Sequence, residues 1–169
     1  MISEEVKKAV LELEKKAESD GIDKKIAGAI VVVNKKILIL KRSEKEDFLP
    51  GIHEIPSGAV EEGETLLEGL QREVFEETGL VIQAIPAFLN TFDYTSASGK
   101  KTRQFNFFVI PLLERVRLNM REHSDFDWWK MNDSVAFEKY MFSKETRQAI
   151  SEAAKYISRR FINTHSLHG

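Results

Sequence analysis

The stretch GAVEEGETLLEGLQREVFEETGL, from residue 58 to residue 80, constrains the fold most because it marks both ends of one helix. Thr65 is followed three residues later by Glu68, the S/T-x-x-E pattern of a capping box, so a helix is expected to begin there. Gly79 suits the left-handed residue that ends many helices. The spacing therefore predicts a helix over 66–78, with an apolar stripe that would pack on a sheet, made of Leu67, Leu70 and Val74.

Helical and strand-like patterns also divide the rest of the chain. One amphipathic helix is predicted over 2–20, with Ser3 as its N-cap and Gly21 as its stop, and another begins near Ser143. Apolar runs bounded by turn signals predict strands between these helices. Only a loop is expected over 131–142. A mixture without strict βαβ alternation predicts an α+β fold with a mixed β-sheet and helices packed on it. The predicted strands cover 27–33, 37–41, 52–55, 81–91, 104–111 and 126–130.

Length and composition favour one globular domain. The chain has 169 residues, of which 42% are hydrophobic and 31% are charged, which suffices for a core of ordinary size. No linker or internal repeat divides it. We therefore expect an N-terminal amphipathic helix over 1–22, a single domain over 23–163 and a disordered tail over 164–169.

Net charge and residue usage limit the partners. A net charge of −2 gives no basic surface of the kind that nucleic-acid polymers need, whereas a small phosphorylated ligand needs only a local positive site. No segment approaches the roughly 18 consecutive apolar residues of a membrane span, and we expect no secretory signal at the N-terminus. The chain has no cysteine, which excludes disulfides and thiol catalysis and fits a cytoplasmic protein.

Three carboxylates gather on one face of the predicted helix. At about 100° per residue, Glu73, Glu76 and Glu77 lie within one turn of each other, beside the apolar stripe. Like charges at this spacing each destabilise a helix by roughly 0.2–0.5 kcal/mol, so this face opposes folding unless a cation neutralises it. Mg²⁺ prefers oxygen ligands, typically carboxylates together with water and substrate phosphates. The pattern indicates either a solvated acidic helix or a metal site.

The residues on either side of this face favour the metal site. Gly58, five residues, Glu64, seven residues and then the run REVFEETGL over 72–80 match the pattern Gly-x5-Glu-x7-Arg-Glu-U-x-Glu-Glu-x-Gly-U, with U apolar, at every specified position. This pattern is the Nudix box, and the surrounding LPGIHEIPSGAVEEGET is similar to MutT-like sequences. The chain therefore resembles the Nudix hydrolase family, in motif over about 49–80 and in strand order over about 26–131.

The resemblance implies a fold, a reaction and a cofactor. Nudix hydrolases are α/β/α sandwiches that cleave a nucleoside diphosphate linked to another group X, using Mg²⁺, with Mn²⁺ as the alternative. The implied partner is a small-molecule nucleotide, with no nucleic-acid polymer and no membrane. The N-terminal helix has no counterpart in the minimal fold, and a homodimer built on it is one expectation.

The resemblance also gives roles to residues within the box. By similarity, Glu73, Glu76 and Glu77 are the metal-binding and catalytic carboxylates, and one of them would also activate water. Arg72 would orient a box glutamate, the alternative being a surface ion pair on the helix. Glu64 would contact the substrate, join the metal shell or orient the loop, and a purely structural role is an equal alternative.

Gly58, at the start of the box, matches the family pattern, whereas the preceding Ser57 departs from it. Relatives commonly carry Pro-Gly-Gly where this chain has Pro56-Ser57-Gly58. By similarity, Gly58 would let the backbone and the substrate approach the metal. The carbonyl group is retained at Ser57, so this residue is still expected to be a metal ligand.

Further candidates lie outside the box. Glu122 precedes Trp128 by six residues, which resembles the spacing of an additional metal-binding acid in MutT-like sequences. Asp125 and Asp127 compete with it for this role, and an ordinary surface loop is the other alternative. Arg42, at the end of the second predicted strand, resembles a position that meets substrate phosphates, or is a surface residue at a strand end.

The leading hypothesis for function is Mg²⁺-dependent hydrolysis of a (deoxy)nucleoside triphosphate to the monophosphate and pyrophosphate, with 8-oxo-dGTP as one candidate. Within the family, the alternatives are another diphosphate such as ADP-ribose or a dinucleoside polyphosphate. From a different class, the alternatives are a non-catalytic nucleotide sensor and a scaffold with an acidic surface helix. The intact box disfavours the sensor, because binding alone does not require all of its carboxylates.

Overall fold

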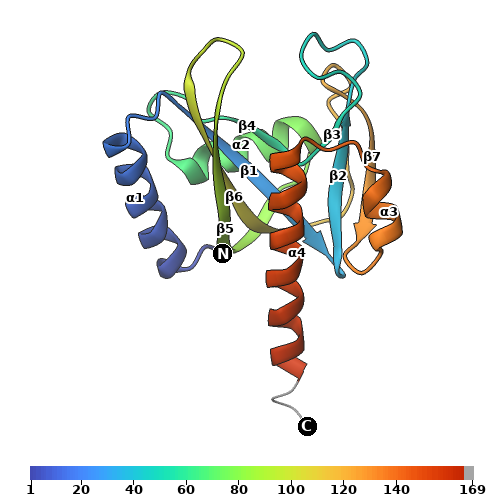
Figure 1. Cartoon of the computed structure of the whole chain (residues 1–169). Helices are drawn as coiled ribbons and strands as arrows, with labels where there is room; N and C mark the ends of the chain where they lie inside the picture. The colour runs from blue at the N-terminus through green and yellow to red at the C-terminus, as the bar shows by residue number, and fades with distance from the viewer. Residues whose placement is uncertain (166–169) are drawn as a thin grey trace.

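Seven strands form one mixed sheet with helices on both of its faces (Figure 1). The computed structural model describes residues 1–165. The predicted tail begins just before the end of the last helix, and 166–169 lie outside the described residues. The elements are α1 (Glu4–Ser19), β1 (Lys24–Val33), β2 (Lys36–Arg42), β3 (His53–Glu54), β4 (Ser57–Ala59), α2 (Leu66–Thr78), β5 (Ile82–Thr95), β6 (Lys101–Pro111), β7 (His123–Lys130), α3 (Ser134–Lys139) and α4 (Lys144–His165).

Strand β1 lies at the centre of the sheet. It runs parallel to β6 and antiparallel to β2 and β4, and the main strand order is β3-β2-β1-β6-β5, with β7 paired to β2. The sequence KIAGAIVVV explains this position, because a strand buried on both faces has a nearly continuous apolar run. The parallel β1–β6 pairing makes the sheet mixed, as predicted.

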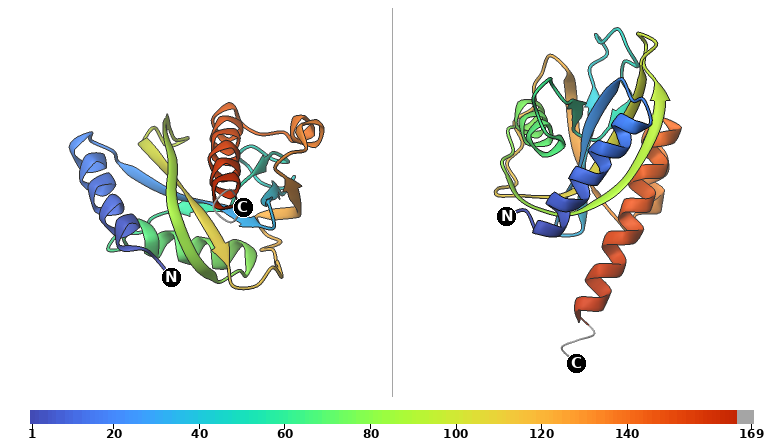
Figure 2. Two further views of the ribbon diagram at one scale, coloured as in Figure 1. Left: turned by 90° about the horizontal axis from the view of Figure 1, so that it is seen from below. Right: turned by 90° about the vertical axis from the view of Figure 1, so that its left-hand side faces the viewer.

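The helices form two layers, one on each face of the sheet. Successive side chains of a strand point to opposite faces. Accordingly, Ala29 and Val31 of β1 pack in a core with α1 and α2, whereas Ile30 and Val32 pack in a second core with α4. Figure 2 shows α1 and α2 on one side of the sheet and α4 on the other. The predicted α+β class and α/β/α sandwich are confirmed.

The N-terminal helix is part of the first core. Ser3 caps α1 as predicted, because its hydroxyl accepts a hydrogen bond from the Val6 backbone N–H at 3.2 Å. Val6 and Val10 are buried against the sheet. In addition, the Glu14 carboxylate accepts from the Leu66 backbone N–H at 2.9 Å. Helix α1 therefore also ties down the start of α2.

One region predicted as a loop contains a helix, so that prediction was wrong. Helix α3 is six residues long and buries none of them, and it therefore leaves no apolar period in the sequence. Its start is fixed by Asp133, whose carboxylate accepts from the Ala136 N–H at 3.0 Å. The turn after α3 docks on β3, where the Met141 N–H donates to His53 Nδ1 at 2.9 Å.

Two loops project from the end of the molecule where α4 begins. Figure 1 shows the tip of the β5–β6 hairpin and, apart from it, the connection between β2 and β3 at this end. The hairpin is longer than predicted, since β5 continues to Thr95 and β6 begins at Lys101. Within residues 1–165, no helix is long and apolar enough to cross a membrane.

Candidate active site

Helix α2 forms as its sequence predicts. The Thr65 hydroxyl accepts from the Glu68 N–H at 3.2 Å, and the Glu68 carboxylate accepts from the Thr65 N–H at 2.8 Å, which completes the capping box. Gly79 ends the helix with φ of 69°. The apolar stripe is buried at Leu70 and Val74. These features fix the position of the acidic face.

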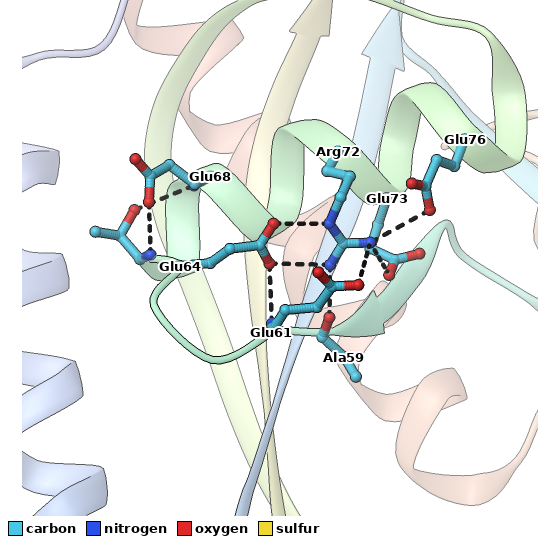
Figure 3. A network of polar contacts seen from close by, with 8 residues as sticks. Ala59, Glu61, Glu64, Glu68, Arg72, Glu73 and Glu76 are labelled. Carbon is cyan, nitrogen blue, oxygen red and sulfur yellow. Dashed lines mark hydrogen bonds and ion pairs between the residues drawn. The ribbon is translucent and has the colours of Figure 1, made fainter.

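Arg72 lies at the centre of this face and uses all of its donors on protein oxygens (Figure 3). Its Nε and Nη2 bind the two carboxylate oxygens of Glu64 at 2.7 and 3.0 Å. Nη1 binds Glu73 at 2.7 Å and Glu76 at 3.2 Å, and Nη2 also donates to the Ala59 carbonyl at 2.8 Å. Arg72 therefore joins helix α2 to the strand and loop that precede it.

Glu64 is the main anchor of Arg72. The Arg72 guanidinium, together with the Glu61 backbone N–H, lowers the pKa of the Glu64 carboxyl to about 2. Paired, bidentate hydrogen bonds of this kind fix both direction and distance. Glu64 therefore holds Arg72 and the loop over 60–64 in place, which agrees with the orienting role among the alternatives considered for it.

The carboxylate of Glu73 lies against the backbone of β4 at Gly58. A Cβ atom added to Gly58 would lie 2.0 Å from the Glu73 carboxylate carbon, so any side chain at this position would displace the Glu73 carboxylate. Burial raises the pKa of Glu73, although its hydrogen bond with Arg72 opposes the shift. The Glu73 side chain is 15% exposed and that of Glu76 is 56% exposed. Glu76 therefore lies at the outer rim of the face.

Glu77 is the most buried of the three box carboxylates, with 4% of its surface exposed. Its Oε2 accepts from the Ser57 backbone N–H at 3.2 Å. Burial, followed by the nearby charges of Glu54, Glu73 and Glu122, raises the pKa of Glu77 well above its usual range. The backbone of Ser57 does not adopt a positive φ, so serine fits where relatives commonly carry glycine.

Glu122 belongs to the same electrostatic environment, since its charge raises the pKa of both Glu73 and Glu77. Its side chain accepts from Asn119 Nδ2 at 3.1 Å. The competing Asp127 instead accepts from the hydroxyl of Tyr140, away from the box. Glu122 is therefore better placed than Asp127 to complete the acidic cluster.

Two residues of the site were missed in the sequence, Glu54 and His123. Among the neighbouring charges, that of Glu54 acts most strongly on Glu77. Oε1 of Glu54 accepts hydrogen bonds from Arg42 Nη1 at 3.3 Å and from His123 Nε2 at 2.8 Å. A signal was present for Glu54: Ile55 packs in the α4 core, so strand alternation turns Glu54 toward α2. Nothing local distinguishes His123, because only the β2–β7 pairing brings it close.

The donor set fits a hard divalent cation. Carboxylate and carbonyl oxygens are the ligands that Mg²⁺ and Mn²⁺ prefer, and the missing side chain at Gly58 lets the Glu73 carboxylate lie against the backbone of β4. Within residues 1–165, no three acidic or histidine side chains already form a cation cluster. In this arrangement, Arg72 donates to one oxygen of Glu73, and the Ser57 N–H donates to one oxygen of Glu77. A cation would compete with these donors.

Comparison with known proteins agrees with the box and the fold. The NUDIX domain profile matches residues 23–150. The chain belongs to the Nudix family. The resemblance seen in the sequence is therefore confirmed, and the sandwich described above is this family's fold in a chain that carries an additional N-terminal helix.

Individual relatives of this Nudix chain have several different names. It is 42% identical over 65 residues to the m7GpppN-mRNA hydrolase NUDT17 of Xenopus laevis, covering 38% of this chain but only 22% of that protein. It is 29% identical over 118 residues to the nucleoside triphosphatase NudI of Escherichia coli strain K12, covering 64% of this chain and 83% of that protein. The MutT protein from Methanosarcina mazei Go1 matches with a TM-score of 0.66 at 23% identity, over 81% of this chain and 94% of that one, which supports the fold.

Proposed function

We propose that this Nudix chain hydrolyses a nucleoside diphosphate linked to another group X with the help of a divalent cation. The observation that carries the proposal is the buried Glu77 carboxylate, whose pKa is raised well above its usual range by burial and by neighbouring carboxylates. Ionising such a group is costly unless positive charge compensates it. A site built in this way is suited to binding a cation during function.

Mg²⁺ is the proposed cofactor, with Mn²⁺ as the alternative. The groups that would hold it are the carboxylates of Glu73, Glu76, Glu77 and Glu122 and the carbonyl of Ser57. When bound, such a cation would neutralise charge on the polyphosphate and lower the pKa of an attacking water.

Among the residues of the chain, Glu77 is the proposed general base. A carboxylate accepts a proton from water more effectively when its pKa lies closer to the working pH. Burial raises the pKa of both Glu73 and Glu77, and the shift is larger at Glu77. The Ser57 N–H holds one oxygen of Glu77 and thereby orients the carboxylate.

The two arginines of the site have different tasks. Arg72 donates all five of its N–H groups to protein oxygens, so it positions Glu73 and Glu76 and has no donor left for substrate. Arg42 donates three N–H groups to protein oxygens, at Phe48, Glu46 and Glu54. Its two remaining N–H groups are proposed to bind a substrate phosphate.

The proposed substrate is a (deoxy)nucleoside triphosphate, cleaved to the monophosphate and pyrophosphate, with 8-oxo-dGTP as one member to test. The similarity to a protein named nucleoside triphosphatase over 83% of that protein's length supports this choice. ADP-ribose, dinucleoside polyphosphates and binding without turnover are the alternatives. A cytoplasmic location and a homodimer that uses α1 are further parts of the proposal.

A panel assay tests the proposal. The protein is incubated with nucleoside triphosphates, 8-oxo-dGTP, ADP-ribose and a dinucleoside polyphosphate, with Mg²⁺, with Mn²⁺ and with EDTA, and released products are identified by mass. Monophosphate and pyrophosphate are expected from a triphosphate only when a cation is present. If the protein binds nucleotides but turns none of them over, the proposed enzymatic activity is wrong. If Glu76→Gln leaves turnover unchanged, the proposed role of Glu76 as a cation ligand is wrong.

A further inference from the structure

His123 is buried at the first position of β7, with 1% of its surface exposed. Its Nε2 lies 2.8 Å from Oε1 of Glu54, a residue of β3 that is 69 positions earlier in the chain. The antiparallel pairing of β7 with β2, and of β2 with β3, brings them together, and the bulge between Lys41 and Arg42 lies beside the contact. The fold therefore builds this pair from three strands.

The other ring nitrogen of His123 has no hydrogen-bond partner within the described part of the chain. A buried polar atom without a partner costs free energy, which a leucine of similar size would avoid. A buried histidine that leaves one nitrogen unpaired is therefore a poor choice for packing alone. The contact that compensates for it is the one between Nε2 and Glu54.

Glu54 in turn is held on one side only. Among residues 1–165, the hydrogen bonds that reach its carboxylate, from Arg42 Nη1 at 3.3 Å and from His123 Nε2, both end on Oε1. Its side chain is 20% exposed, and within residues 1–165 no hydrogen bond reaches Oε2. The charge of Glu54 acts on Glu77 more strongly than the charges of Glu73 or Glu122 do. Glu54 therefore belongs to the acidic cluster of the active site.

We propose that His123 is a positioning residue which, together with Arg42, fixes Oε1 of Glu54 so that Oε2 accepts a hydrogen bond from water beside Glu77. This inference rests on the proposed function, because the water it concerns is the one that attacks the substrate. Glu54 then contributes to catalysis directly, and His123 contributes through Glu54. The pairing also explains why a histidine occupies a fully buried site at the start of β7.

A double-mutant cycle tests this role. The variants are Glu54→Gln, His123→Asn, His123→Gln and the double variant that combines Glu54→Gln with His123→Asn. The amide of glutamine reaches the position of Nε2, whereas the amide of asparagine reaches only the position of Nδ1. Ile157→Val, a buried change in α4 away from the cluster, controls for lost stability. Values of kcat and KM are measured with the best substrate of the panel, below the melting temperature of every variant.

We expect Glu54→Gln and His123→Asn each to lower kcat about tenfold or more, with KM changed less than about twofold. The double variant should lose less than about twofold more than Glu54→Gln, because coupled residues are not additive. His123→Gln should recover most of the kcat. Multiplicative losses in the double variant, equal losses with asparagine and glutamine, or losses that follow only the melting temperature would overturn the proposal.

A second measurement does not depend on turnover. In nitrogen-15 NMR spectra of the wild-type protein, the His123 Nε2–H proton should be protected from exchange, and Glu54→Gln should shift its resonance or remove its protection. A protected proton in a protein that hydrolyses nothing on the panel would refute the proposed function and leave the His123–Glu54 contact standing. An unprotected proton in an active enzyme would refute the positioning role alone.

Discussion

Gly58 and Glu73 are packed so closely that a methyl group on the first would occupy the carboxylate of the second, with 2.0 Å between the added Cβ and the carboxylate carbon. The glycine on β4 and the glutamate on α2 are 15 residues apart in the chain, and both are fixed positions of the box. The spacing of the motif thus reflects a contact between a strand and a helix.

Replacing Gly58 by alanine should displace the Glu73 carboxylate. We expect turnover to fall by about 100-fold or more, since small displacements of catalytic groups are known to cost this much. The melting temperature should fall as well, because the displaced carboxylate loses its hydrogen bond with Arg72. Steady-state kinetics and thermal melts measure the two effects.

Gly21→Ala is the matched control for Gly58→Ala. Gly21 has φ of 69° and nothing within 4 Å of an added Cβ, so alanine there adds only backbone strain. Gly21→Ala should therefore lower the melting temperature and leave kcat unchanged. Full activity of Gly58→Ala would show that the contact with Glu73 does not matter for catalysis.

Glu77→Gln should stabilise the cation-free protein as the pH rises. The pKa of Glu77 is raised in the folded state, so its contribution to stability is full below the unfolded pKa and is lost as pH rises toward the folded value. Glutamine does not ionise and keeps an acceptor for the Ser57 N–H. In thermal melts in EDTA from pH 4 to pH 8, the melting temperature of Glu77→Gln should therefore rise relative to that of the wild type as the pH increases.

Mg²⁺ should reverse this order. Added cation should raise the melting temperature of the wild type more than that of Glu77→Gln, because a ligand that binds the folded state more tightly stabilises it more. Equal shifts for both proteins would show that Glu77 is not a cation ligand.

Arg72→Lys should remove the acid sensitivity that belongs to Glu64. The pKa of Glu64 is lowered to about 2, so the stability from this pair is present above the unfolded pKa and is lost as pH falls toward 2. Lysine cannot form the two-oxygen contact. In urea unfolding from pH 7 to pH 2.5, the difference in the free energy of unfolding between wild type and variant should close at the acidic end. A difference that stays constant with pH would contradict the ion pair.

Arg72→Lys should also lower turnover by about tenfold or more, because Glu73 and Glu76 lose their hydrogen bonds with Arg72.

Helix α1 should contribute to stability like any core element. Val10 is buried against the sheet and Leu11, its neighbour, is 57% exposed. Val10→Ala should cost about 1–3 kcal/mol in the free energy of unfolding, whereas Leu11→Ala should cost less than about 0.5 kcal/mol. Equal costs in urea unfolding would mean that α1 is not docked as described.

The parts of this protein that the sequence predicted well are those with local causes. The capping box at Thr65, the left-handed Gly79 and the apolar run of β1 each depend on neighbours in the chain, and the structure confirms them. Helix α3 was missed because it is short and exposed, which removes the apolar period on which such predictions depend.

The box itself was predicted as a pattern, but its internal contacts were not. The sequence indicated that Arg72 would meet a glutamate, whereas the structure shows it bound to Glu64, Glu73 and Glu76 at once. Glu54 and His123 were missed because their contact depends on the pairing of three strands and a bulge, which no local pattern encodes.

A paired measurement asks whether the carboxylates of α2 bind a cation and support the hydrolysis of a nucleotide. Pyrophosphate release from a nucleoside triphosphate with Mg²⁺ is compared between Glu77→Gln and Glu62→Gln, where Glu62 is an exposed residue of the adjoining loop. We expect a loss of about 100-fold or more for Glu77→Gln and wild-type release for Glu62→Gln. Equal release by the two variants would show that Glu77 is not needed for hydrolysis.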